Sequence, residues 1–117
     1  MEKYSELLLD TNFVIEATKR RVIDDARALV PGAKLVTLEA VVDELKGKKL
    51  ALELIKAEGV EVLPVKGYAD KAIEEYAEKG GVAVATNDKA LTEKLRVKGV
   101  AVVFPTKQGC DIVGGIV

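Results

Sequence analysis

The chain of 117 residues contains no histidine. This absence excludes Ser-His-Asp and Cys-His catalysis, His-ligated zinc and acid–base chemistry by an imidazole. Cys110 is the only cysteine, so an intramolecular disulfide and a metal site built from thiols alone are excluded as well. Any hydrolytic chemistry in this chain must therefore use carboxylates, lysines, hydroxyl groups or a hard metal ion.

Aromatic residues make up only 4% of the chain, and no apolar run approaches the roughly 18 to 20 residues of a membrane span. Hydrophobic residues nevertheless reach 49%, so the core must be built from Val, Leu, Ile and Ala, which suits a buried parallel sheet. The polar start and the short apolar run after it do not resemble a signal peptide, so we expect a cytoplasmic protein. A net charge of −1 neither favours nor excludes a nucleic-acid partner.

Asparagine is also scarce, since it occurs only at Asn12 and Asn87. Glutamine occurs once, methionine only at the start, and charged residues reach 32%. This depletion of thermolabile side chains indicates a heat-adapted protein, from a thermophile, which should not melt well below about 60 °C. Each remaining asparagine lies within two residues of an aspartate, which suggests a functional role for both.

Short apolar runs alternate with amphipathic stretches along the chain, which predicts βα units with right-handed crossovers. We expect one α/β domain over residues 1–117, a three-layer α/β/α sandwich with a central parallel sheet of about five strands. The glycine-rich tail 105–117 has no assignable pattern. The expected strands are 6–10, 33–37, 60–65 (at an edge, because of Pro64), 82–86 and 100–104. The expected helices are 13–20 (with Thr11 and Asn12 as N-cap candidates), 24–29, 38–46, 48–58, 68–79 and 87–97.

Two aspartates follow expected strands. Asp10 closes the first strand, and Asp88 comes two residues after the strand 82–86. Ligands of an open parallel sheet bind outside the carboxyl ends of its strands, so both are site candidates. Either aspartate alone is equally well explained as a helix N-cap. Their near-identical settings, Leu-Asp-Thr-Asn and Thr-Asn-Asp, favour a shared site.

Helical geometry, at about 100° per residue, identifies further candidate acids. In the helix expected after the second strand, Asp43 points about 150° away from the apolar face, whereas Glu39 and Glu44 lie on its flanks, about 110° off. In the helix expected before the fourth strand, Asp70 is the acid nearest the apolar face, about 80° from its centre. Its place in the first turn is equally well explained by the helix dipole.

Several carboxylates at one edge of a sheet would repel each other strongly unless a cation lay among them. Sites made only of oxygen ligands select hard ions such as Mg²⁺ or Mn²⁺. Such an ion can activate water and stabilise the leaving oxygen of a phosphodiester. In a chain without histidine, metal-assisted phosphoryl chemistry is the most natural use of such a cluster.

Four segments, taken in order, resemble the PIN-domain nucleases. They are 7–12 (LLLDTN), 41–45 (VVDEL), 68–73 (YADKAI) and 84–89 (VATNDK), and the closing segment 98–104 fits as well. No single motif is specific, because Asp-Thr-Asn after a strand is common. The ordered set, which spans about residues 6–104, carries the resemblance to a small free-standing member of that family.

The resemblance implies a PIN-like fold whose acids meet in one pocket, with Mg²⁺ or Mn²⁺ as cofactor, RNA as substrate and a homodimer as the assembly. All the acids of the family's pattern are present, although the chain is short between the second and third of them, which leaves little room for an added clamp helix. By matching position, the catalytic metal ligands would be Asp10, Glu44, Asp70 and Asp88, and the supporting polar groups Thr11, Asn12, Thr86 and Asn87.

Basic side chains should line the approach to such a site if RNA binds there. Lys46, Lys48 and Lys49 lie closest in sequence to Glu44 and are our candidates for phosphate contacts. Clusters at 19–21 and 94–98 follow other acid-bearing segments, and all of these lysines could equally belong to solvated helix faces. Because interleaved aromatics are missing, cleavage without strong base stacking is expected.

Other functions of the same fold class fit less well. A phospho-acceptor receiver domain would need a pair of acids at the first strand, but Leu9 precedes Asp10. A haloacid-dehalogenase-like phosphatase would need an aspartate where Asn12 stands. A non-catalytic RNA-binding module would not need the intact acids. Within the nuclease reading, a toxin of a toxin–antitoxin pair, with an antitoxin partner, and an enzyme of RNA processing remain open. The forms Tyr-Ala-Asp and Thr-Asn-Asp-Lys lean slightly towards processing.

Overall fold

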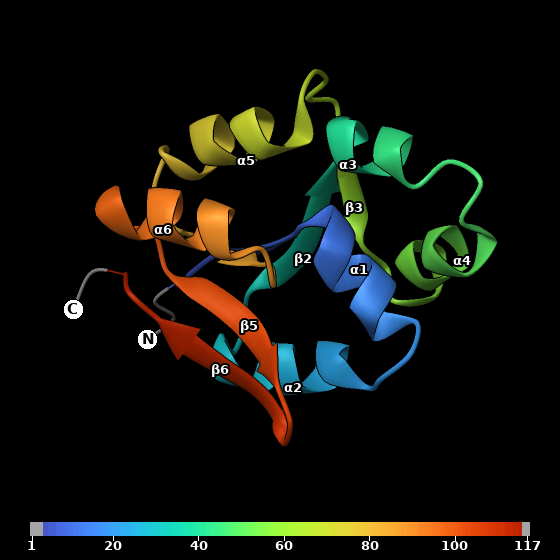
Figure 1. Ribbon diagram of the computed structural model, residues 1–117, viewed down its shortest axis with the longest axis horizontal. Helices are drawn as coiled ribbons and strands as arrows, with labels where there is room; N and C mark the ends of the chain where they lie inside the picture. The colour runs from blue at the N-terminus through green and yellow to red at the C-terminus, as the bar shows by residue number, and fades with distance from the viewer. Residues whose placement is uncertain (1–3, 116–117) are drawn as a thin grey trace.

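A mixed sheet of six strands runs through the centre of the molecule (Figure 1). The computed structural model describes residues 4–115. The strands are β1 (Glu6–Leu9), β2 (Lys34–Leu38), β3 (Glu61–Leu63), β4 (Val82–Ala85), β5 (Val102–Thr106) and β6 (Gly109–Val113), in the spatial order β3-β2-β1-β4-β5-β6. β1 to β5 are parallel and β6 is antiparallel. The predicted parallel sheet of five strands is confirmed, with one strand added.

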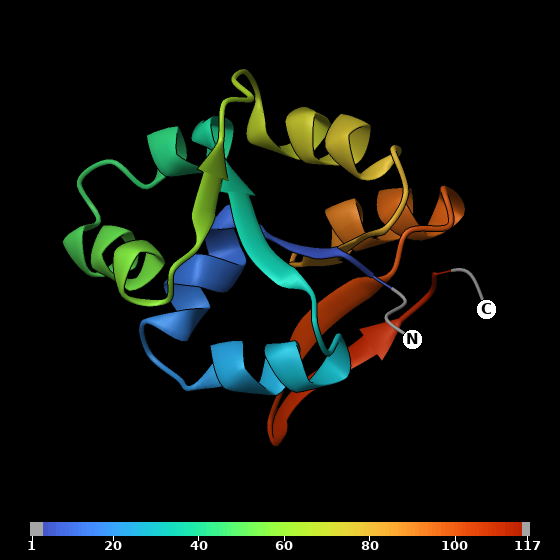
Figure 2. The ribbon, with the colours of Figure 1, turned by 180° about the vertical axis from the view of Figure 1, so that it is seen from behind.

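Helices cover both faces of this sheet, which confirms the predicted sandwich. Figures 1 and 2 show α5 and α6 on one side and α2 on the other. Right-handed crossovers explain this arrangement, because the chain moves from β1 towards β3 and then returns past β1 to β4 and β5. The helices are α1 (Thr11–Ala17), α2 (Val22–Leu29), α3 (Glu39–Glu44), α4 (Lys49–Ala57), α5 (Ala69–Ala77) and α6 (Lys89–Val97).

The strand order also separates this fold from the receiver domains. In the receiver-type order 2-1-3-4-5, the first strand lies between the second and the third. Here β1 lies between β2 and β4, and β3 is at the edge, as Pro64 predicts. Among residues 4–115, no helix is long and apolar enough to cross a membrane.

β1 is central, and its apolar residues show why the sequence pattern was readable. Leu7, Leu8 and Leu9 are all buried, although successive side chains of a strand point to opposite faces. A strand covered on both faces is apolar throughout, and β4 (VAVA) follows the same rule. These runs therefore mark the strands that lie next to the site.

The tail contains β6, which the sequence analysis did not assign. β5 continues to Thr106, and a turn at 107–108 returns the chain along β5. Gly109 adopts φ 138°, and Cys110 Sγ donates a hydrogen bond to the carbonyl oxygen of Val22 in α2, 3.4 Å away. Burial raises the pKa of the Cys110 thiol to about 11, which keeps the thiol protonated and lowers its reactivity at neutral pH. Gly109 and Asp111 within the strand, and Gly114 and Gly115 directly after it, hide the strand pattern.

Most expected elements end within two residues of their predicted ends, and the main exception is α1. The prediction that Thr11 and Asn12 are N-caps is wrong, because Asp10 occupies the N-cap position and the helix begins at Thr11. The helix also ends early, at Ala17, where the hydroxyl of Thr18 donates to the carbonyl of Ile15. Thr11 is thereby free to use its side chain elsewhere.

Substituting Gly109→Ala should lower the free energy of unfolding by about 1–3 kcal/mol. A Cβ at this position would lie 2.9 Å from Asp25 Oδ2, in addition to the strain of a positive φ. Gly99→Ala is the matched control, since Gly99 also has a positive φ but no atom within 4 Å of the added Cβ. Denaturant titration of both variants measures the difference. Equal destabilisation would show that the contact with Asp25 adds nothing to the strain of the backbone.

Candidate active site

Asp10 is buried at the carboxyl end of the central strand. It is 3% exposed, and its backbone N–H donates to the carbonyl oxygen of Ala85 at 2.9 Å. The Thr86 hydroxyl donates a hydrogen bond of 2.6 Å to Asp10 Oδ2, and Thr86 itself is fully buried. The bond links the ends of β1 and β4 and fixes the direction of this carboxylate.

Asp88 is joined to the same threonine. Its backbone N–H donates to Thr86 Oγ1 at 3.1 Å, while its Oδ1 accepts from the backbone N–H of Leu91 at 3.0 Å. Asp88 is thus the N-cap of α6 and also lies beside Asp10. The two explanations offered by the sequence, a helix cap and a site residue, are compatible for Asp88. Asp10 makes no side-chain cap bond in α1.

Glu44 is the acid of α3 that the structure ties to this region. The Thr11 hydroxyl donates to Glu44 Oε1 at 2.6 Å, so the first turn of α1 holds the last residue of α3. The other acids of α3 pair with lysines, Glu39 with Lys66 at 3.6 Å and Asp43 with Lys46 at 3.5 Å. Helical geometry alone left Glu39 and Glu44 equivalent, and the bond from Thr11 separates them.

Asp70, in the first turn of α5, links these acids electrostatically. Burial raises the pKa of Asp70, and the charges of Asp88 and Glu44 raise it further, while Lys94 acts in the opposite direction. Burial likewise raises the pKa of Asp10, where the bond from Thr86 opposes the effect and the charges of Asp70 and Asp88 add to it. Asp10 thus interacts with Asp70 and Asp88, and Asp70 also interacts with Glu44; the four carboxylates connected in this way are called here the acid cluster (Asp10, Glu44, Asp70 and Asp88).

The acid cluster suits a hard divalent cation by its chemistry. Its donors are carboxylate oxygens only, and the raised pKa values of Asp10 and Asp70 are relieved by a nearby positive charge. As placed in residues 4–115, no three acidic or cysteine side chains already have the geometry to hold one ion. Mutual repulsion favours a separation of the carboxylates. Glu44 is hydrogen-bonded to Thr11, and Asp10 to Thr86.

The expected supporting residues behave in two ways. The hydroxyl groups of Thr11 and Thr86 donate hydrogen bonds to acids of the cluster, Glu44 and Asp10 respectively. Asn12 and Asn87 are exposed, and neither side chain forms a hydrogen bond within the described part of the chain. Lys94 belongs to the basic cluster 94–98 noted in the sequence, but its effect on Asp70 was not predicted, because it arises only once α5 and α6 are neighbours. It lines a cavity of about 550 Å³ together with Asp70.

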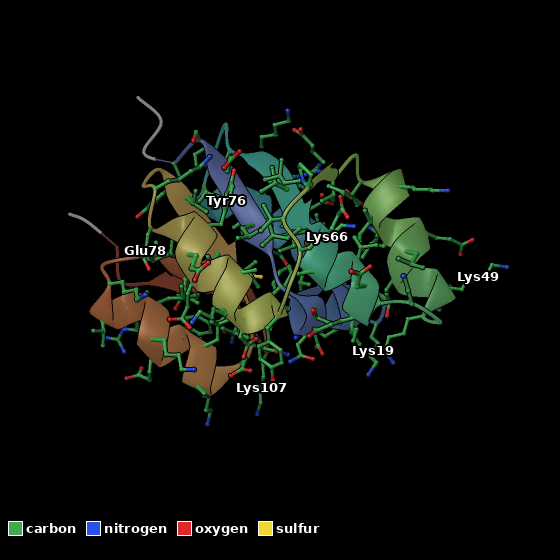
Figure 3. All side chains as sticks on the ribbon, turned by 90° about the horizontal axis from the view of Figure 1, so that it is seen from above. Lys19, Lys49, Lys66, Tyr76, Glu78 and Lys107 are labelled. Atoms are coloured by element: carbon green, nitrogen blue, oxygen red, sulfur yellow. The ribbon has the colours of Figure 1, made fainter. Side chains whose placement is uncertain are left out.

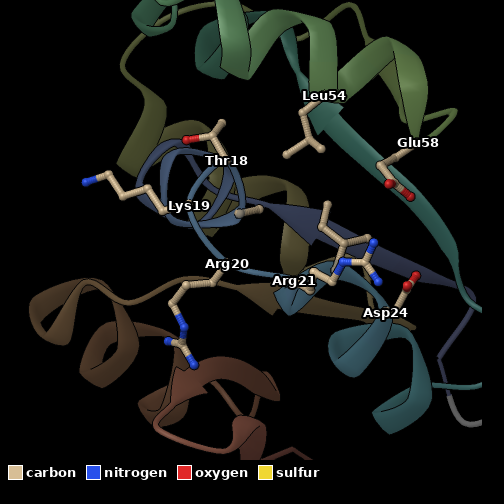
Figure 4. Close-up of a pocket in the computed structure, with 9 residues that line it drawn as sticks. Thr18, Lys19, Arg20, Arg21, Asp24, Leu54 and Glu58 are labelled. Carbon is tan, nitrogen blue, oxygen red and sulfur yellow. The ribbon is translucent and has the colours of Figure 1, made fainter.

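The predicted phosphate contacts Lys46, Lys48 and Lys49 are all exposed, at the connection between α3 and α4. Lys46 pairs with Asp43, and Figure 3 shows Lys49 projecting outwards from α4. A second basic group, at 19–21, lines a cavity of about 420 Å³ (Figure 4). There Arg20 is engaged by Glu16 and by the carbonyl oxygen of Thr106.

The variant Asp70→Asn should melt at a higher temperature than the unmodified protein in metal-free buffer at neutral pH. A carboxyl with a raised folded-state pKa costs stability as pH rises above its unfolded value of 3.8, and an amide removes that cost. Mn²⁺ should raise the melting temperature of the unmodified protein and not that of the variant. Thermal melts with and without Mn²⁺ test both statements, with the exposed Asp43→Asn as control. An equal Mn²⁺ response in all three proteins would contradict the cluster.

Comparison with known proteins gives a consistent result. A family model described as "PIN like domain" matches residues 7–107. Ribonuclease VapC4 of Methanocaldococcus jannaschii is 38% identical over 114 residues, covering 83% of this chain and 87% of that protein. The solved structure of the PIN domain endonuclease Utp24 superimposes with a TM-score of 0.81 at 23% identity, over 96% of this chain and 95% of that one. At that identity the second likeness concerns the fold alone.

Proposed function

Because this chain belongs to the family of PIN-like domains, we propose that it is a metal-dependent endoribonuclease that hydrolyses phosphodiester bonds of single-stranded RNA. One observation carries the proposal: in a chain without histidine, Asp10, Asp70 and Asp88 interact electrostatically at the carboxyl end of the sheet, and Asp70 connects them to Glu44. The similarity to Ribonuclease VapC4 supports RNA as the substrate.

Asp10, Glu44, Asp70 and Asp88 would hold the ion, and Mg²⁺ or Mn²⁺ suits their oxygen donors. When bound, such an ion activates water and stabilises the leaving oxygen of the phosphodiester. Two of the proposed ligands have directions fixed by hydrogen bonds, Asp10 by Thr86 and Glu44 by Thr11. Ligands fixed by such bonds lose less freedom on binding the ion.

The role that we favour is the toxin of a toxin–antitoxin pair, with an antitoxin as its protein partner. Ribonuclease VapC4 is similar to this chain in sequence, whereas the likeness to Utp24 concerns the fold alone. This outweighs the slight lean of the motifs towards RNA processing. We also propose a homodimer and a cytoplasmic location, and size-exclusion chromatography with light scattering measures the first.

Lys46, Lys48 and Lys49 remain our candidates for contacts to RNA phosphates near Glu44. The pair between Lys46 and Asp43 is no obstacle, because both side chains are more than half exposed and such pairs contribute little. These lysines follow the helix that ends at Glu44, so a strand of RNA that reaches the acid cluster can pass near them.

The central test is cleavage of a labelled single-stranded RNA in Mn²⁺. Asp10→Asn and Glu44→Gln should each lower the rate by about 100-fold or more, since each removes a charge that holds the ion. EDTA should abolish cleavage of the unmodified protein.

Asp43→Asn is the matched control for Glu44→Gln, because it removes a neighbouring carboxylate on the same helix that pairs with Lys46 instead. Its rate should stay close to that of the unmodified protein. Cleavage that survives in Asp10→Asn or in EDTA would sink the metal-dependent mechanism. An unmodified protein that binds RNA without cutting it would instead be a binding module.

Thr86→Val should lower the rate of RNA cleavage by about 10- to 100-fold while the protein remains folded. The variant keeps the volume of the side chain but removes the hydroxyl that bonds Asp10 and accepts from Asp88.

Thr37→Val provides the comparison for Thr86→Val, since Thr37 is also fully buried but bonds only to the carbonyl oxygen of Leu9. Rates are measured at several Mn²⁺ concentrations, because a misoriented Asp10 should demand more metal. Equal losses in the two variants would assign Thr86 a purely structural role.

A further inference from the structure

A groove of about 600 Å³ lies between α6 and the β5–β6 hairpin, which are neighbours in Figure 1. The hairpin contributes apolar side chains, each partly buried, and α6 with the residue that leads into it contributes polar ones. The acid cluster does not use any of them. We call this feature the hairpin groove, and it is lined by Asn87, Lys89, Thr92, Glu93, Arg96, Phe104, Pro105 and Val113.

The strand register places the hairpin groove beside the acid cluster. Leu9 pairs with Ala85, and Ala85 pairs with Val103. One residue further along the same strands stand Asp10, Thr86 and Phe104. Residues in register on neighbouring parallel strands project from the same face, so Phe104 follows Asp10 and Thr86 in one row.

Phe104 is unusual in this chain because its ring is not fully used by the core. The other phenylalanine, Phe13, is completely buried, whereas Phe104 is only partly buried and lines the groove with Pro105. An aromatic ring at the wall of a groove offers a face on which a planar base can stack. Stacking on Phe104 could not be predicted from the sequence, because nothing in the sequence separates this phenylalanine from a core residue.

The polar wall of the groove carries positive charge. Lys89 is exposed and forms no ion pair with any residue between 4 and 115. Arg96 pairs with Glu93 at 3.3 Å, a contact between exposed side chains that is readily exchanged for another anion. An apolar floor with cationic side chains at its rim is complementary to a nucleotide, which joins a flat base to a phosphate.

We propose that the hairpin groove binds one base of single-stranded RNA, stacked on Phe104, next to the nucleotide whose phosphate reaches the acid cluster. This inference rests on the proposed ribonuclease function and names the subsite that holds its substrate. Single strands are favoured because the bases of a duplex are already stacked on each other. Lys89 contacts the adjoining phosphate.

Binding of a fluorescent single-stranded RNA of eight nucleotides tests the stacking, with the protein carrying Asp10→Asn so that the RNA stays intact. Adding Phe104→Leu should weaken binding about tenfold. The measurement is repeated with RNAs in which one base at a time is removed and the ribose–phosphate chain is kept. For the RNA that lacks the stacked base, Phe104→Leu should leave the binding affinity unchanged. The protein change and the missing base then act as the two changes of a double-mutant cycle.

Melting curves establish that Phe104→Leu is folded, and Lys89→Gln provides a second variant on the exposed side of α6. Lys89→Gln should weaken binding and reduce the salt dependence of log Kd by about one phosphate contact. Lys34→Gln is the control, because Lys34 begins β2, which lies on the other side of β1 from β4 and β5, and pairs with Glu61.

The proposal is overturned if Phe104→Leu leaves affinity unchanged, or if it weakens binding to every RNA equally, whichever base is missing. In both cases the groove does not stack a base, and a peptide would be the next occupant to consider. The assay does not depend on cleavage. If the unmodified protein cuts no RNA, base-specific coupling to Phe104 would support stacking in the hairpin groove while refuting the proposed ribonuclease function. If the unmodified protein cuts RNA and no such coupling is found, the ribonuclease function would stand and stacking on Phe104 would be refuted.

Discussion

The burial of one carboxylate, that of Asp10, is the constraint on which the arrangement of the site depends. A charge taken out of water costs several kcal/mol unless hydrogen bonds or an opposite charge replace the lost water. Here Thr86 supplies a bond of 2.6 Å, and the backbone N–H of Thr11 also favours the charged form. The raised pKa of Asp10 shows that these bonds do not offset the burial completely. Buried, mainly apolar strands on both sides of β1 supply the stability that this arrangement requires.

The other acids intensify this imbalance and do not relieve it. Asp70 and Asp88 add repulsion to Asp10, and Asp70 experiences Asp88 and Glu44 in turn. Bringing all four negative charges together costs free energy. Two of the carboxylates are held by hydrogen bonds from threonines, Asp10 by Thr86 and Glu44 by Thr11. Under the proposed function, a divalent cation would remove the repulsion and the need for that separation at once. The same electrostatics that raise the pKa values of Asp10 and Asp70 would then favour binding of the ion.

How much of this could be read from the sequence depended on whether the signal was local. The five parallel strands and the positions of Asp10 and Asp88 follow from apolar runs and the acids after them, which depend on neighbouring residues only. Helical geometry did not separate Glu44 from Glu39; the family resemblance named Glu44, and the physical reason for it is a contact with Thr11, 33 residues away in the chain. The bridging role of Thr86 and the charge of Lys94 beside Asp70 likewise exist only after the sheet and helices assemble. β6 escaped because glycines and a charge break its short pattern, although its pairing with β5 completes the edge of the sheet.

The division of charge along the edge of the sheet bears on how an acidic site can bind a polyanion. RNA is repelled by four carboxylates, so under the proposed function its affinity would come from groups outside the acid cluster and from an ion that these acids hold. The net charge of −1 permits this only if positive charge is concentrated locally. Lys89 and Arg96 border a groove whose apolar wall, at Phe104, stands in the same row as Asp10 and Thr86. A base seated there would set the position of the neighbouring phosphate through the spacing of adjacent strands, which is about 4.8 Å and is held by the backbone hydrogen bonds of the sheet. In such an arrangement the rigid sheet, and not a mobile loop, determines which phosphodiester bond meets the acids.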